Sequence, residues 1–256
     1  MTGTTASGRL TALGRAELTL LVRNRTAVFV ALLMPLLMIV AMKSSLEQVD
    51  LGGTGLSVAG LALTGGLGIV LLQVVYMNLV ASYVARREEL VLKRLRTGEV
   101  SDREILTGTA LPSVLLAFAQ SALMIVVGGL AFDLGAPERF DLLLAGLLLG
   151  AVLMAALAAA TSALTRSVQT AQLTTLPLFM VSLLGSGLFL PLEIFPGLAA
   201  SLCELLPLTG VMTLVRAGWL GAGAGDDVLG AALSALAWTA LAVFAVQRWF
   251  RWDPRR

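Results

Sequence analysis

The chain has 256 residues, of which 57% are hydrophobic and only 13% are charged, and its mean hydropathy is +0.90. Soluble domains carry about 25% charged residues, so this composition excludes an ordinary water-soluble fold, and the net charge of +2 excludes an extended basic surface for nucleic acid. With no histidine and one cysteine, Cys203, the chain offers no intrachain disulfide, no cysteine cluster for a metal and no histidine-dependent catalytic site.

The first expected element is a short amphipathic helix over residues 10–24. At 100° per residue its leucines gather on one side, while Arg15 and Arg23 gather on the other. This pattern is typical of a helix that lies in the membrane interface against acidic head groups of the lipids. Glu17 falls in the middle of the leucine face, so it either pairs with a basic residue of a neighbouring segment or extends its carboxylate out to water.

Six apolar stretches are long enough, or nearly so, to cross a bilayer as helices, which predicts an all-α integral membrane protein of one domain. Of the 18 Lys and Arg residues, all but Lys43, Arg139 and Arg216 fall on the side of the N-terminus. The positive-inside rule then predicts that both termini are cytoplasmic. The composition, rich in Ala, Leu, Gly and Arg, suggests a bacterial cell membrane. The predicted spans are 26–42, 57–84, 107–132, 142–164, 171–190 and 228–247.

The loop between the second and third spans carries its own helix signals. Glu89 and Lys93 are spaced for an i, i+4 ion pair, and Gly98 is placed to end a helix. Ser101 and Glu104 then form an S-x-x-E capping box that starts the third span. The pattern predicts a separate cytoplasmic helix over residues 86–97.

Leu90, Leu92 and Leu95 lie among the charges of this loop, which favours docking onto a soluble partner. The alternative is a solvated charged loop that only obeys the positive-inside rule. A third possibility for the whole chain, a membrane anchor or sensor without transport, would use the same loop for docking.

Polar or soft side chains inside the spans are candidates for a substrate pathway, because such residues are costly when they face lipid. Packing between helices is the alternative explanation for each of them, and for Thr174, Thr175, Ser182 and Ser186 it is the favoured one. The pathway candidates are Gln73, Tyr76, Met77, Asn78 and Gln120.

Residues 191–224 are apolar enough to suggest a seventh span, but Pro207, Arg216 and several glycines interrupt them. An odd number of spans would also place the arginine-rich tail outside the cell. We therefore expect a broken external segment that dips into the membrane without crossing it.

Three segments together resemble a known family. The first runs from Glu17 to Pro35, the second from Glu88 to Arg96, and the third is Ser186-Gly187-Leu188-Phe189-Leu190-Pro191, followed by further prolines and Arg216. In this order, and with six spans, they resemble the membrane subunits of type 2 ATP-binding-cassette (ABC) exporters, whose cytoplasmic loop reads R-E-x-G-x-L-K-R-L-R. Leu90 and Val91 stand where the family often has glycine and a small residue.

The resemblance implies that the 86–97 helix couples the permease to a separate cytoplasmic ATPase, which binds ATP and Mg. This chain lacks a G-x-x-x-x-G-K-[ST] phosphate loop, so it is not expected to be an enzyme. The implied ATPase-coupling residues are Arg87, Glu88, Glu89, Leu92, Lys93, Arg94, Leu95 and Arg96. The implied external gate consists of Gly187, Phe189, Pro191, Pro196 and Pro207.

The resemblance further implies two permease copies, identical or related, around one pathway, and export of a hydrophobic or amphipathic small molecule such as a drug or antibiotic. Lipid, glycan and sodium ion remain alternative cargoes of the same architecture. An intramembrane enzyme is disfavoured, because the spans contain no paired carboxylates.

Overall fold

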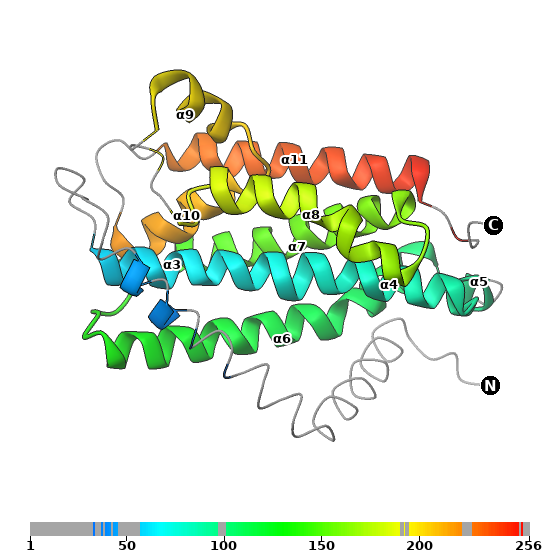
Figure 1. Ribbon diagram of the computed structural model, residues 1–256, viewed down its shortest axis with the longest axis horizontal. Helices are drawn as coiled ribbons and strands as arrows, with labels where there is room; N and C mark the ends of the chain where they lie inside the picture. The colour runs from blue at the N-terminus through cyan, green and yellow to red at the C-terminus, as the bar shows by residue number, and fades with distance from the viewer. Residues whose placement is uncertain are drawn as a thin grey trace.

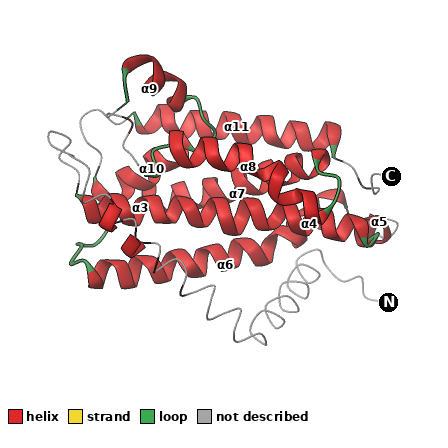
Figure 2. Cartoon of the chain, viewed as in Figure 1, coloured by secondary structure: helices red, strands yellow, loops and turns green. Residues whose placement is uncertain are grey.

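The computed structural model describes residues 33, 37, 39–41, 43–45, 57–96, 101–189, 192, 195–221, 227–250 and 252 (Figure 1). The amphipathic helix expected over 10–24, with Glu17 and Arg23, lies outside the described residues, as do Pro191 and most of the first span at 26–42. The described part of the chain contains helices and no strand (Figure 2).

The second span is one long helix in three parts: α3 (Val58–Val70), a π-helical stretch η1 (Leu71–Met77) and α4 (Asn78–Glu88). After the short helix α5 (Val91–Arg96), the chain continues as α6 (Asp102–Ala131), α7 (Phe140–Leu164) and α8 (Val168–Gly185). It ends with α9 (Gly197–Glu204), α10 (Thr209–Leu220) and α11 (Val228–Trp249).

Five of these helices are long and apolar enough to cross a membrane: Val58–Glu88, α6, α7, α8 and α11. They overlap the spans predicted at 57–84, 107–132, 142–164, 171–190 and 228–247, with ends that differ by up to five residues. The predicted α-helical membrane fold is therefore confirmed for the described residues.

The helix Val58–Glu88 is the centre of the bundle (Figure 1). In its most apolar window 78% of the residues are buried, compared with 22% in α8 and 11% in α11. The outer helices therefore keep apolar faces that are covered in the membrane by lipid or by another chain.

The segment 191–224, predicted to be broken and external, contains the pair α9 and α10, which are bent by 94° against each other, so the predicted break is present. α10 packs against α7, α11 and α3. Its approach to α7 is close because Gly218 faces Leu143: a Cβ added to Gly218 would lie 2.6 Å from the Leu143 Cα. α10 is therefore an integral layer of the bundle rather than a loop at its surface.

Capping boxes mark the starts of two helices, α6 and α8. The Ser101 hydroxyl accepts from the Glu104 N–H, and the Glu104 carboxylate accepts from the Ser101 N–H at 2.8 Å. This confirms the predicted capping box. A second capping box, which joins Ser167 and Thr170, starts α8.

We call the end of the bundle that carries α5 the α5 end, and the opposite end, where α10 finishes, the α10 end (Figure 1). The α7–α8 turn lies at the α5 end, because Arg87 of α4 bonds to its carbonyls. The C-terminus of α11 lies there too, since Phe250 makes an edge-to-face ring contact with Tyr83.

Candidate functional site

The helix expected over residues 86–97 is interrupted. Residues up to Glu88 belong to α4, the chain turns at Glu89 and Leu90, and only Val91–Arg96 forms the separate helix α5. Leu90 has a φ of +60°, a left-handed conformation that glycine adopts without steric cost and leucine does not. The break explains why glycine suits the corresponding position of the family loop.

The residues of this segment divide into an exposed and a buried set. Glu88, Glu89, Leu90 and Arg94 are exposed, and Leu95 is half-buried. Leu92, which we expected to face the ATPase, is fully buried and is not available to a partner in this structure. The side chains of Lys93 and Arg96 lie outside the described part of the chain.

Arg87 also differs from its expected role as a contact for the ATPase. Its side chain is 1% exposed. Its Nη1 donates to the Ser162 carbonyl at 2.8 Å, and its Nη2 donates to the Thr165 carbonyl at 2.5 Å. These carbonyls belong to the last turn and C-cap of α7, where the helix dipole places partial negative charge. Arg87 therefore caps α7 and ties α4 to the α7–α8 turn.

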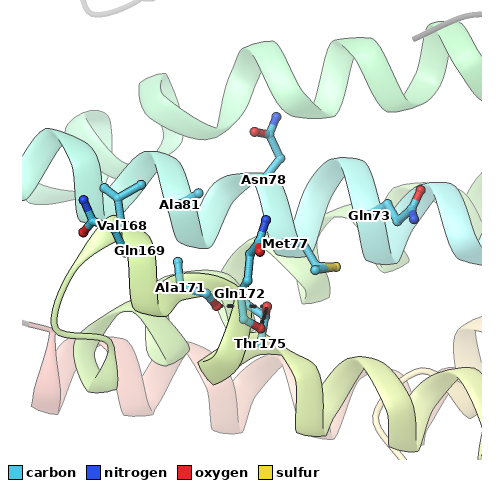
Figure 3. A pocket seen from close by; sticks show the side chains of 9 residues that line it. All are labelled: Gln73, Met77, Asn78, Ala81, Val168, Gln169, Ala171, Gln172 and Thr175. Atoms are coloured by element: carbon cyan, nitrogen blue, oxygen red, sulfur yellow. Dashed lines mark hydrogen bonds between the residues drawn. The ribbon is translucent and has the colours of Figure 1, made fainter. Parts of the chain in front are cut away.

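A groove of about 540 Å³ lies between the second span and α8 (Figure 3). It extends from Gln169, in the first turn of α8 at the α5 end, to Gln73 in η1. Gln73 precedes the end of α4 by fifteen residues, which is about 20 Å along a helix. None of the lining side chains is charged. They are Gln73, Met77, Asn78, Ala81, Val168, Gln169, Ala171, Gln172 and Thr175.

Three of the five residues proposed for a pathway line the groove, namely Gln73, Met77 and Asn78, although the Asn78 amide points toward α6, where it donates to Ser113 Oγ at 3.2 Å (Figure 3). The other two face elsewhere. Tyr76 is buried, with its hydroxyl 3.2 Å from Thr161 Oγ1 of α7, and Gln120 is 3% exposed within α6. For these two residues the structure supports the alternative explanation, packing between helices.

Gln169 and Gln172 are groove residues that our sequence reasoning missed. With Thr175 they follow an i, i+3, i+6 spacing along one side of α8. The signal was present, because α8 has the lowest hydropathy of the five candidate spans. Exposed amides on a membrane helix indicate a surface that faces water, a ligand or another polar surface rather than lipid.

At the α10 end the second span is covered by the segment that follows α8. Leu188 and Met212 both pack against Gly68, five residues before Gln73. Gly187 has a φ of +74°, and its carbonyl accepts a hydrogen bond from Nη2 of Arg216 in α10. The polar groove therefore ends below a tightly packed layer at the α10 end.

The expected gate residues surround this layer to different degrees. Gly187 and Pro207 are buried within it, and Phe189 is half-buried. Pro196 is exposed at the start of α9, where it is the N-cap residue. Arg216, which the sequence placed only in the external segment, is the side chain that fixes the Gly187 turn.

The described residues include no cluster of three or more His, Cys, Asp or Glu side chains that could hold a metal ion.

Comparison with known proteins identifies the family. The family model of the ABC-2 type transporter matches residues 9–220, which is most of the chain. No curated protein is similar enough to the chain to count as a match. The chain therefore belongs to the ABC-2 type transporter family, as the multi-pass membrane subunit, itself not catalytic, of an ABC exporter.

Proposed function

We propose that this chain carries an uncharged amphipathic molecule, of drug or antibiotic size, out of a bacterial cell along the groove between the second span and α8. A separate cytoplasmic ATPase, which binds ATP and Mg, drives the transport from the α5 end, and a second permease copy completes the pathway. The observation that carries the proposal is the groove itself, a charge-free surface with three exposed glutamines inside a membrane-spanning bundle.

The distribution of charge supports a cytoplasmic α5 end with both termini inside. Arg94, Arg103, Arg166 and Arg248 are exposed at that end. At the α10 end the exposed acids Asp133, Glu138, Asp141 and Asp227 predominate. Since basic residues are retained on the cytoplasmic side of a membrane, the groove then begins at the cytoplasm and is closed toward the outside.

The chemistry of the groove supports a neutral cargo. The glutamine amides offer hydrogen-bond donors and acceptors, while Met77 and Val168 offer apolar contact. A sodium ion or an organic cation would be better served by carboxylates, and the groove lining has none. An amphipathic molecule with uncharged polar groups matches both kinds of surface.

Docking of the ATPase is supported by the exposed charges beside the α4–α5 turn, namely Glu88, Glu89 and Arg94. Rim charges of this kind orient a partner and set its association rate. The double charge reversal Glu88→Lys with Glu89→Lys should abolish co-purification of the ATPase and its stimulation by the permease, with the protein still inserted. Glu204→Lys, an exposed acid on α9 at the opposite end, is the matched control. Undiminished ATPase activity in the double variant would refute docking at the α5 end.

The cargo proposal is tested with inside-out vesicles that contain the complex. The panel consists of a neutral glycosylated antibiotic, a cationic dye, radioactive sodium and a short-chain phospholipid. We expect ATP-dependent accumulation of the neutral antibiotic. The variants Gln73→Glu and Gln172→Glu should weaken it and improve transport of the cationic dye, while Gln247→Glu, an exposed glutamine on α11, should change neither. Preferred uptake of sodium, phospholipid or dye by the unmodified complex would refute a neutral cargo.

A further inference from the structure

The buried arginine at the end of α4 is the start of a chain of hydrogen bonds. Arg87 and Arg86 are neighbours in sequence but differ in environment. Arg86 is half-buried and reaches Thr109 Oγ1 at 3.4 Å, whereas Arg87 is 1% exposed and donates to two carbonyls at the end of α7. A guanidinium has donors that diverge in a plane, so it bridges two carbonyls in a way that the ammonium of lysine does not.

The chain of hydrogen bonds continues through Thr165, the residue that links α7 to the turn before α8. Thr165 is fully buried. Its carbonyl accepts from Arg87, and its hydroxyl lies 2.8 Å from the hydroxyl of Thr174 on α8. The Arg87 guanidinium is thus joined to α8 through a single intervening residue. We call Arg87, Ser162, Thr165 and Thr174 the relay.

One end of the relay adjoins the α4–α5 turn, where the ATPase is proposed to dock, and the other end adjoins the groove. Arg87 precedes the Glu89–Leu90 turn, and beyond that turn α5 carries the fully buried Leu92 and contacts α4 and α6. Thr174 precedes Thr175, which lines the groove together with Gln172. Only 22% of the most apolar window of α8 is buried, and the helix contacts α4, η1 and α7.

We propose that Arg87 is a positioning residue that transmits movement of the α4–α5 turn to α8, the movable wall of the groove, through Thr165 and Thr174. The inference rests on the proposed function, because it assumes an ATPase that acts at the α5 end. It replaces the direct ATPase contact that the sequence suggested for Arg87. The test below measures the coupling between the α5 end and α8 directly.

The test needs no knowledge of the cargo. Cys203 is the single cysteine, so Cys203→Ser gives a background without thiols. Gln172→Cys then places one thiol in the groove wall. The complex with its ATPase is reconstituted in lipid nanodiscs, and the rate of labelling by a charged maleimide is measured without nucleotide and after trapping with ATP and vanadate. The ratio of the two rates reports how far ATP binding changes access to α8.

Thr174→Val removes the hydroxyl with little change in shape, and Arg87→Lys keeps the charge but not the two-carbonyl bridge. We expect each variant to reduce the nucleotide-dependent ratio by about 2- to 10-fold, the effect of losing one hydrogen bond of ordinary strength. Matched controls are Thr107→Val, an exposed threonine whose hydroxyl donates to carbonyls of its own helix, and Arg248→Lys, an exposed arginine on α11. Both should keep the ratio of the unmodified complex.

The double variant separates a relay from two independent structural effects. If Arg87 acts through Thr174, then Thr174→Val should add little to Arg87→Lys, whereas independent effects multiply. A ratio that stays unchanged in Thr174→Val, or effects that multiply, would overturn the inference. Failure of the proposed function has a different signature, namely a ratio near one in the unmodified complex. If Arg87→Lys does not insert, Arg87→Gln, which keeps a planar donor group but cannot bridge both carbonyls, takes its place in the same cycle.

Discussion

The contact between α10 and α7 gives a stability prediction with a defined magnitude. Gly218 lies so close to Leu143 that an added Cβ would be 2.6 Å from the Leu143 Cα and 2.8 Å from its Cβ, well inside van der Waals contact. Most of the obstruction is backbone, which has no alternative rotamer. Gly218→Ala therefore pushes the two helices apart. The cost expected for overpacking a tightly packed core is about 1–3 kcal/mol.

For a chain of this size, each 1 kcal/mol of lost stability lowers the melting temperature by about 2–4 °C. We therefore expect Gly218→Ala to lower the apparent melting temperature in detergent by about 5 °C, measured by fluorescence-detected gel filtration after heating. The control is Gly197→Ala, in the first turn of α9, where an added Cβ meets no atom within 4 Å. Equal melting temperatures for the two variants would refute the close approach of α10 to α7.

Two further pairs of variants test the turns at Leu90 and at Gly187 by the same heating assay. Leu90 has a φ of +60°, so Leu90→Gly should be more stable than Leu90→Ala by about 1 kcal/mol, the reverse of the order expected inside a helix. A more stable alanine variant would contradict the left-handed turn. Arg216→Met removes the donor to the buried Gly187 carbonyl and should cost about 1–3 kcal/mol, whereas Arg248→Met, at an exposed site, should cost almost nothing. Equal losses from the two arginine variants would show that the bond to Gly187 does not stabilise the turn.

Elements with long or local signals could be predicted from the sequence. The five observed spans follow from uninterrupted apolar stretches, and the start of α6 follows from the Ser101–Glu104 capping box. The break between α9 and α10 follows from Pro207, one of the four residues between them, because proline has no N–H to continue the hydrogen bonding of the helix before it. Each of these signals acts within a few residues, so no tertiary contact needed to be known.

The direction in which individual side chains point could not be predicted in the same way. Arg86 and Arg87 obey the positive-inside rule equally, yet they point about 100° apart on α4, and only Arg87 meets the end of α7. Leu92 looks like a docking leucine in the sequence but is fully buried, on a helix that contacts α4 and α6. Which face meets a neighbour depends on helix packing that a single sequence does not specify.

α8, which forms the side wall of the groove, and α10, which belongs to the layer that closes one end of it, differ in how firmly they are held. This difference limits which of them can move. α10 is packed against α7, α11 and α3, with close approaches at Gly218 and at Gly146, where Val215 fits against the bare backbone. α8 has a mostly unburied surface, and the bond between Thr165 and Thr174 is one of its few polar ties to α7. Interfaces as tightly packed as that of α10 do not deform gradually. Opening of the groove should therefore displace α8 and the Gly187 turn around a fixed α10, with Arg216 as the contact that has to be broken.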